Sequence, residues 1–189
     1  MQRDIYKQLL DWKEKESRKP LILNGARQVG KTYILRKFGE QEYQKFAFFS
    51  LDRNQNAREV FEKGGSTADI LMALSAISQD RNLKVREVFE KGESTADIIM
   101  ALSAISQVDI TPGDTLVVLD EIQDCPKALE ALKFFCEETP DIHIIVAGSL
   151  LGLSLHNGVS YPVGKVEELR LYPMSFLEFL NAMNKTQLL

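Results

Sequence analysis

The stretch NGARQVGKT, residues 24–32, decides the fold of this chain, because it matches the pattern Gly-x-x-x-x-Gly-Lys-Thr. Its two glycines, Gly25 and Gly30, have no side chains, so the loop between them can turn its backbone amides inward onto phosphate oxygens. The apolar run PLILNG predicts a short buried strand before the loop, and YILRKFGEQ predicts a helix after it that ends at Gly39. A strand, a glycine-rich loop and a helix in this order predict a phosphate-binding site at the helix N-terminus.

Two side chains at the end of the loop add chemistry to the backbone amides. The ammonium group of Lys31 can follow the outer phosphates, and the hydroxyl of Thr32 suits Mg²⁺, a hard cation that prefers oxygen ligands. From average residue usage, the pattern arises by chance in a chain of this length on the order of one per cent of the time. We therefore expect a nucleotide-binding loop that consists of Gly25, Ala26, Arg27, Gln28, Val29, Gly30, Lys31 and Thr32.

Strand-length apolar runs alternate with helical patterns along the rest of the chain. Such alternation builds βαβ units, so it predicts a three-layer α/β fold in which a mainly parallel sheet lies between helices. The chain has 189 residues, of which 44% are hydrophobic, and we expect one domain over residues 1–189. The predicted strands are PLILNG (20–25), KFAFFSLD (45–52), TLVVLDE (115–121), IHIIVAGS (142–149) and a short one around EELRLY, and the predicted helices are the N-terminal segment up to residues 18–20, YILRKFGEQ, KALEALKFFCEE after Pro126, and SFLEFLNAM.

A tandem duplication interrupts this plan. Residues 52–79, DRNQNAREVFEKGGSTADILMALSAISQ, recur as residues 80–107, DRNLKVREVFEKGESTADIIMALSAISQ, with five differences, at positions 55, 56, 57, 65 and 71 of the first copy. Two copies are too few for a solenoid, so we interpret them as a duplication inside one connection. In each copy a serine, Ser66 or Ser94, can cap an amphipathic helix. We expect one helix to be surplus and to pack on its sibling or on another chain.

Composition and charge exclude several classes of function. The formal net charge is −4 and the pI is near 5.3, so the sequence does not support binding to nucleic acid or to an anionic membrane surface. No apolar run approaches the roughly 18 residues of a membrane span, and the first residues lack a leader pattern, so we expect a cytoplasmic protein. Cys125 and Cys136 lack the spacing of metal ligands and are expected to be reduced structural thiols.

A pair of acidic residues ends the apolar run in LVVLDEIQ. An unpaired carboxylate is costly at the end of a buried strand, so Asp120 is explained if it lies beside Mg²⁺, directly or through water. Glu121 can then polarise a water molecule for in-line attack on the γ-phosphate. The alternative is that Glu121 only caps a loop. We therefore expect Thr32 and Asp120 to hold the metal and Glu121 to be catalytic.

A third candidate ends the predicted strand IHIIVAGS. Ser149 places a hydroxyl at the carboxyl end of this strand, where it can sense the γ-phosphate or position the attacking water. An ordinary serine at a strand end is the alternative. Together with Lys31 and Glu121, Ser149 completes the expected catalytic residues.

The surrounding sequence separates the classes of nucleotide-binding protein. A GTPase needs Asn-Lys-x-Asp to read guanine, whereas Asn184 and Lys185 are followed by Thr186 and Gln187. A small-molecule kinase needs an arginine-rich lid, and the sequence contains no such cluster. An Asp-Glu pair after a hydrophobic strand favours Mg-dependent ATP hydrolysis, so the expected cofactors are ATP and Mg²⁺.

A larger set of segments resembles one family. RKPLILNGARQVGKT, FSLDRN, TLVVLDEIQDCPKALEALKFFCEE, HIIVAGSLLG, YPVGK and LYPMSFLEFL are similar to the N-terminal core of the bacterial and archaeal AAA-superfamily ATPases that carry a C-terminal domain of unknown function. The resemblance covers nearly the whole chain except the extra 28 residues. It implies a cytoplasmic P-loop NTPase with a five-stranded parallel sheet in the order 5-1-4-3-2. It also implies that the helical lid and further domain of the family are absent.

The same resemblance implies roles for single residues. Lys31 and Thr32 take the Walker A positions, Asp120 and Glu121 form the Walker B pair, and Ser149 takes the sensor 1 position. An arginine from a neighbouring subunit could stabilise charge on the γ-phosphate, and the sequence does not choose between Arg27, Arg170 and others. A homo-oligomer is therefore expected through this arginine or through the duplicated helix.

Three functions remain open at this point. The first is an ATP-binding, ATP-hydrolysing AAA-type domain, and the second is an interaction module that binds nucleotide without hydrolysis. The third is a structural scaffold that keeps the loop but binds no nucleotide. Glu121 favours the first, because a module that only binds has no need of a carboxylate there.

Overall fold

Five parallel strands form the centre of the fold, in the order β2-β3-β4-β1-β5. The computed structural model describes residues 3–51, 94–149 and 161–183. When the strands are counted from β5, their order is 5-1-4-3-2, so the predicted five-stranded parallel sheet is confirmed. The elements are α1 (Ile5–Lys13), β1 (Leu21–Gly25), α2 (Lys31–Glu42), β2 (Lys45–Ser50), α6 (Thr95–Ser106), β3 (Thr115–Asp120), the 3₁₀ turn η1 (Ile122–Asp124), α7 (Pro126–Glu138), β4 (His143–Gly148), β5 (Glu167–Leu171) and α9 (Phe176–Ala182).

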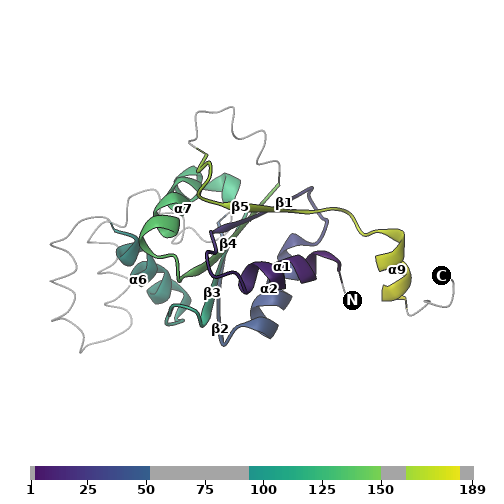
Figure 1. Ribbon diagram of the computed structural model, residues 1–189, viewed down its shortest axis with the longest axis horizontal. Helices are drawn as coiled ribbons and strands as arrows, with labels where there is room; N and C mark the ends of the chain where they lie inside the picture. The colour runs from purple at the N-terminus through teal and green to yellow at the C-terminus, as the bar shows by residue number, and fades with distance from the viewer. Residues whose placement is uncertain (1–2, 52–93, 150–160, 184–189) are drawn as a thin grey trace.

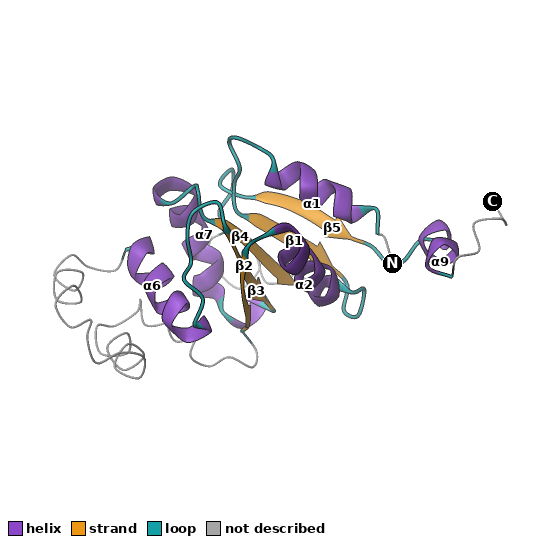
Figure 2. Ribbon diagram, turned by 90° about the horizontal axis from the view of Figure 1, so that it is seen from below, coloured by secondary structure: helices purple, strands orange, loops and turns teal. Residues whose placement is uncertain are grey.

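Helices cover both faces of the sheet, as the alternating pattern predicts. Helices α1 and α2 pack on one face, and α6 and α7 pack on the other (Figure 2). Helix α9 lies away from these layers (Figure 1). The core is therefore divided by the sheet into two hydrophobic clusters, one under each pair of helices.

Strand β3 shows why its sequence is a continuous apolar run. All six of its residues are buried. Leu116 and Val118 belong to the cluster under α1 and α2, whereas Val117 and Leu119 belong to the cluster under α6 and α7. A parallel strand that is covered on both faces has no side for polar residues. The apolar run of β3 therefore ends in a charged residue, Asp120, only at the carboxyl end of the strand.

The parallel register brings the carboxyl ends of the strands to one edge of the sheet. The loops that follow β1, β3 and β4 therefore begin close together, which is where ligands bind in open α/β sheets. Strand β4 lies between β1 and β3. The residues that lie level with one another near this edge are Gly25 and Leu171, Asn24 and Gly148, and Ser50 and Asp120.

The second copy of the repeat contributes α6. Ser94 stands at the predicted start of this helix, and it forms a capping box with Asp97. Leu102 is fully buried, and Ile98 and Ile105 pack against the same cluster, so the predicted apolar stripe faces the core. The helix packs on α7 and β2. The first copy, residues 52–79, lies outside the described residues, and so does the expected surplus helix.

Two predicted helix ends were wrong. Helix α2 continues through Gly39 to Glu42, because Gly39 makes room for a neighbour: a Cβ atom there would lie 2.2 Å from the ring of Phe46 on β2. Helix α1 ends at Lys13, well before residues 18–20. The chain turns back there, and the guanidinium of Arg18 donates to the Lys13 carbonyl at 2.8 Å.

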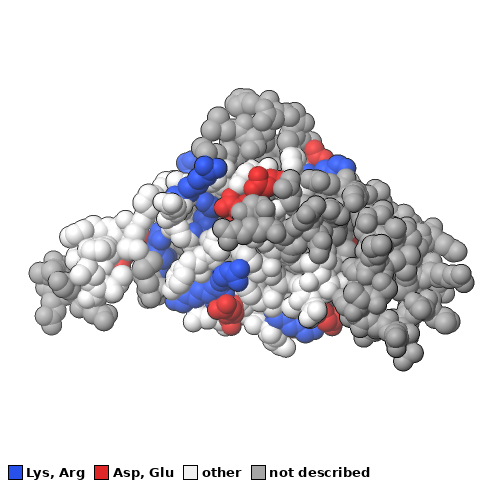
Figure 3. Space-filling view, turned by 180° about the vertical axis from the view of Figure 1, so that it is seen from behind, with Lys and Arg blue, Asp and Glu red and all other residues white. Residues whose placement is uncertain are grey.

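Charges of both signs are spread over the described surface. Lysine, arginine and acidic side chains all occur on the face in Figure 3. Over the residues that the structure describes, we find no helix long and apolar enough to cross a membrane. Cys125 is buried and Cys136 is half-buried.

Candidate functional site

The phosphate loop, residues 25–32, joins the end of β1 to the start of α2, and its conformation requires both glycines. A Cβ atom on Gly25 would lie 2.6 Å from the Leu171 carbonyl oxygen, so only glycine allows β1 to end so close to β5. Gly30 has φ +95°, a left-handed conformation that glycine adopts without strain. Gln28 is also left-handed, with φ +64°. The loop therefore turns sharply into the helix N-terminus, where free amides can meet an anion.

Lys31 closes the phosphate loop on itself. Its Nζ donates to the carbonyl oxygens of Gly25 and Ala26, both at 2.8 Å, and the residue is buried. Burial lowers the pKa of Lys31, while the nearby carboxylates of Glu121 and Asp120 work in the opposite direction. The ammonium group is thus held over the loop by contacts that phosphate oxygens can replace.

Thr32 and Asp120 come together, as the sequence predicts. The Thr32 hydroxyl donates to Oδ2 of Asp120 at 2.6 Å, and the Glu121 amide donates to Oδ1 at 3.0 Å. Asp120 is only 3% exposed. Burial raises its pKa, and the two hydrogen bonds oppose this rise. The carboxylate is therefore held ready at the edge of the sheet at a cost in desolvation.

This oxygen pair fits Mg²⁺. Across the described segments, no group of three or more histidine, cysteine, aspartate or glutamate side chains could hold a metal ion. Mg²⁺ does not need such a cage, because it keeps several waters and takes phosphate oxygens with one or two protein ligands. The hydroxyl of Thr32 and the carboxylate of Asp120 are oxygen ligands of this kind, next to the phosphate loop.

Glu121 is held in an unusual conformation. Its φ is +57°, in the left-handed region that non-glycine residues rarely adopt. Its carboxylate accepts a hydrogen bond from Nε2 of Gln123. Strained backbone of this kind gathers at functional sites, where surrounding contacts maintain it.

Gln123 joins two of the predicted catalytic residues, and the sequence analysis missed it. While its Nε2 holds Glu121, its Oε1 accepts a hydrogen bond of 3.3 Å from the Ser149 amide. The side chain thus connects the turn after β3 with the end of β4. The available signal was its position two residues after Glu121 in LVVLDEIQ, which alone assigns no role.

The hydroxyl of Ser149 is buried without a partner among the described residues. Ser149 is 4% exposed, and its Oγ makes no hydrogen bond within that part of the chain. Leaving a buried hydroxyl unsatisfied destabilises a protein. A ligand or an ordered water at the carboxyl edge of β4 would satisfy it.

Both candidate arginines lie on the surface, and the charge of Arg27 is close enough to lower the pKa of Lys31. Arg27 is exposed on the phosphate loop. Arg170 is exposed on β5, and its guanidinium lies over the ring of Tyr172, 5.7 Å from the centroid. A third arginine, Arg3, is buried against the loop and was not expected from the sequence.

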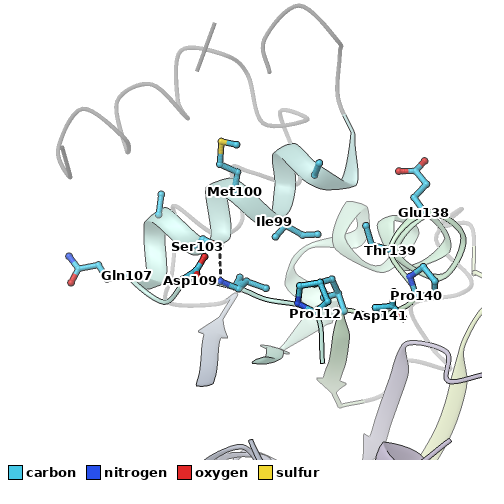
Figure 4. Close-up of a pocket in the computed structure, with 14 residues that line it drawn as sticks. Ile99, Met100, Ser103, Gln107, Asp109, Pro112, Glu138, Thr139, Pro140 and Asp141 are labelled. Carbon is cyan, nitrogen blue, oxygen red and sulfur yellow. Dashed lines mark hydrogen bonds between the residues drawn. The ribbon is translucent and has the colours of Figure 1, made fainter. Parts of the chain in front are cut away.

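A separate cavity lies at the opposite edge of the sheet. It has a volume of about 850 Å³ and lies between α6 and the segments that precede β3 and β4. Figure 4 shows Ile99, Met100 and Ser103 of α6 on one side and Pro112, Thr139 and Pro140 on the other. Because it lies at the amino ends of these strands, it is not part of the phosphate-loop site.

Comparisons with known proteins bear on the fold and the family. A family model described as an AAA domain matches residues 17–180. Among curated protein sequences, none matches the chain. The solved structures that are similar include the Walker-type ATPase of Pyrococcus abyssi, with a TM-score of 0.57 and 18% identity over 97% of this chain. A second is a chain in Drosophila ORC bound to DNA, with a TM-score of 0.48 and 17% identity over 94% of this chain.

The chain spans 57% of the length of the Pyrococcus ATPase chain and 44% of the Drosophila chain. At these identities the first likeness shows the fold alone, in agreement with the five-stranded parallel sheet. The family model is more informative, since its match includes the phosphate loop, Asp120, Glu121 and Ser149. The protein therefore belongs to the AAA domain family.

Proposed function

We propose that the protein binds Mg-ATP at the phosphate loop and hydrolyses its γ-phosphate. The observation that carries this proposal is the contact between Thr32 and Asp120, which joins the phosphate loop to the acidic pair after β3. A phosphate-binding loop, a metal-binding oxygen pair and a carboxylate for water meet at one edge of the sheet. Each of these groups is needed for phosphoryl transfer to water.

The phosphate loop holds and orients the nucleotide. Backbone amides of residues 26–31 face the phosphates at the N-terminus of α2, where the helix dipole favours negative charge. Lys31 exchanges the carbonyls of Gly25 and Ala26 for phosphate oxygens. Thr32 and Asp120 hold Mg²⁺, which when bound neutralises charge on the outer phosphates.

The carboxylate of Glu121 orients the attacking water and takes up its proton. Gln123 fixes the direction of this carboxylate through its Nε2 donor. Ser149, whose hydroxyl has no partner among the described residues, donates a hydrogen bond to the γ-phosphate or to the water. Gln123 also holds the Ser149 amide, so the two groups keep a fixed relation to each other.

A second candidate function is binding without turnover. The observation behind it is the hydrogen bond from Gln123 to Oε2 of Glu121, which under this alternative holds the carboxylate turned away from the attacking water. Under this alternative the protein is an interaction module that responds to nucleotide.

We infer that residues 1–189 act as one domain in the cytoplasm and that an arginine from a neighbouring subunit reaches the γ-phosphate. Such an arginine can contribute a factor of about 10³ to 10⁵ in rate. The first copy of the repeat offers an additional surface for self-association, since its sequence repeats the apolar stripe of α6.

The test compares the wild-type chain with Glu121→Gln and Glu40→Gln. Phosphate release from Mg-ATP and the affinity for Mg-ATP are measured for each protein. Glu40 is exposed on α2 and serves as the matched control. Hydrolysis requires Glu121→Gln to lose about 10² to 10⁴ in turnover while it keeps Mg-ATP affinity. Glu40→Gln should behave as wild type.

The other outcomes separate the two functions. Wild-type protein that binds Mg-ATP but releases no phosphate at any protein concentration supports the interaction module. Specific activity that rises with protein concentration supports an arginine between subunits. Wild-type protein without affinity for Mg-ATP rejects both candidates.

A further inference from the structure

Arg3 is buried beside the phosphate loop and makes three directed contacts. It is 6% exposed. Nη1 donates to the Val29 carbonyl at 3.2 Å, and Nη2 donates to the Tyr172 carbonyl, just after β5, at 2.7 Å. Nε donates to Oε1 of Glu178 on α9 at 2.9 Å. One guanidinium therefore joins the phosphate loop, the end of the sheet and α9.

Glu178 is held as fully as Arg3. It is 6% exposed, and its Oε1 also accepts from the Asp4 amide at 2.9 Å. Its Oε2 accepts from the Ser175 amide at 2.8 Å and completes the capping box of α9. Burial acts to raise the pKa of Glu178, but the amides of Ser175 and Asp4 and the Arg3 guanidinium outweigh it, so the pKa lies below its ordinary value.

The ion pair of Arg3 with Glu178 is a main contact that attaches α9 to the rest of the protein. Within α9 the buried residues are Glu178 and Leu180, whereas Phe176, Leu177 and Phe179 are exposed. A buried ion pair is weak evidence for stability, because desolvation offsets much of the attraction. Its geometry can instead specify how two parts of a protein are placed.

The contact with Val29 bears on one phosphate-binding amide. In a trans peptide the carbonyl oxygen and the following N–H point in opposite directions. The bond from Arg3 to the Val29 carbonyl therefore fixes the plane of the Val29–Gly30 peptide and turns the Gly30 N–H away from Arg3. Gly30 has no Cβ and φ +95°, so it would otherwise have wide conformational freedom.

We propose that Arg3 is a positioning residue that fixes the Gly30 amide for phosphate binding and couples the phosphate loop to α9 through Glu178. This inference rests on the proposed nucleotide site. Because the direction of the Gly30 amide is already fixed, it loses less conformational entropy when it binds an anion, and binding is stronger. By reciprocity, nucleotide in the loop strengthens the attachment of α9.

The test compares the wild-type chain with Arg3→Met, Arg3→Lys, Glu178→Gln and the control Arg18→Met. Arg18 is a matched arginine, since its guanidinium also holds backbone carbonyls, those of Lys13 and Lys15, but away from the loop. The first measurement is the ¹⁵N order parameter of the Gly30 amide without nucleotide, and the second is the affinity for Mg-ATP.

Arg3→Met should lower the Gly30 order parameter from about 0.85 to below about 0.6, and Arg18→Met should leave it unchanged. Glu178→Gln should lower it by less than Arg3→Met, because the bond from Arg3 to the Val29 carbonyl remains. The dissociation constant for Mg-ATP should rise by about tenfold in Arg3→Met and by less than about twofold in Arg18→Met. The dissociation constant of Arg3→Lys should lie between those of the wild-type chain and Arg3→Met, because one ammonium group cannot reproduce the three directed hydrogen bonds of the guanidinium. The double variant Arg3→Met/Glu178→Gln should bind no more weakly than Arg3→Met alone.

Gly30 order and Mg-ATP affinity that stay at the wild-type values in Arg3→Met overturn the proposal. So does an equal loss of order in Arg18→Met, because it would show a general loss of stability. A wild-type chain that fails to bind Mg-ATP defeats the proposed function, while the order parameters still decide whether Arg3 fixes the Gly30 amide.

Discussion

The hydroxyl of Thr32 donates a 2.6 Å hydrogen bond to the carboxylate of Asp120, 88 residues along the chain. The bond forms although β4 separates β3 from β1. The phosphate loop must therefore reach over the end of β4, and it does so at the edge where all strands present their carboxyl ends.

The charge of Asp120 should make the nucleotide-free protein less stable at neutral pH. Because burial raises its folded-state pKa above the unfolded value near 3.8, the free energy of unfolding rises as pH falls through the folded pKa and levels off below 3.8. Asp120→Asn should therefore have the higher Tm at pH 7 and lose this advantage in acid. Thermal unfolding of both proteins between pH 7 and pH 4 checks the sign. A difference in Tm that is constant with pH would contradict it.

Removing the side-chain amide of Gln123 should slow catalysis without weakening binding. Gln123→Leu keeps most of the side-chain volume but breaks the hydrogen bonds to Glu121 and from Ser149. We expect kcat to fall by about tenfold and KM to stay the same, since the lost contacts orient the reacting groups. Steady-state phosphate release checks this, with Gln8→Leu on the exposed face of α1 as control. A rise in KM alone would assign Gln123 to substrate binding.

Ser149→Ala should separate stability from activity. The buried Oγ of Ser149 has no partner in the described part of the chain, so its removal should raise the free energy of unfolding by about 1 kcal/mol or leave it unchanged. Turnover of Mg-ATP should fall in the same variant. Ser103→Ala is the control, because its Oγ accepts from the Ile110 amide at 3.2 Å and its loss should destabilise. Denaturant titration measures both variants, and destabilisation by Ser149→Ala would oppose a ligand-facing hydroxyl.

The two copies of the repeat should respond differently to the same substitution. Leu102 is fully buried in the cluster under α6 and α7, so Leu102→Ala should destabilise by about 2 to 5 kcal/mol. Leu74 holds the equivalent position in the first copy. If the first copy is surplus, Leu74→Ala should change the free energy of unfolding by less than about 0.5 kcal/mol. Equal losses in both variants, measured by denaturant titration, would show that both leucines are needed in the core.

Local signals were sufficient for much of this fold. The continuous apolar run before Asp120 predicted a strand covered on both faces, and the glycine spacing in residues 24–32 predicted the phosphate loop. Apart from the pairing of Thr32 with Asp120, contacts between distant segments carried no such signal. Gly39 looked like a helix end because its partner, Phe46, was not visible in the local pattern. Arg3 has partners 26, 169 and 175 residues away, so no local pattern identifies it.

The place of the duplication has a consequence for how this protein can change in evolution. The two copies of the repeat, residues 52–107, belong to the connection from β2, which is an edge strand, to β3, and the second copy includes α6. Lengthening a connection there moves no strand out of register, and each doubling of a loop's length costs only about 0.6 kcal/mol in closure entropy. Ser50 and Asp120 thus remain level whatever the length between β2 and α6. The connection that leaves this edge strand is therefore a place where a lineage can add sequence without moving the phosphate loop.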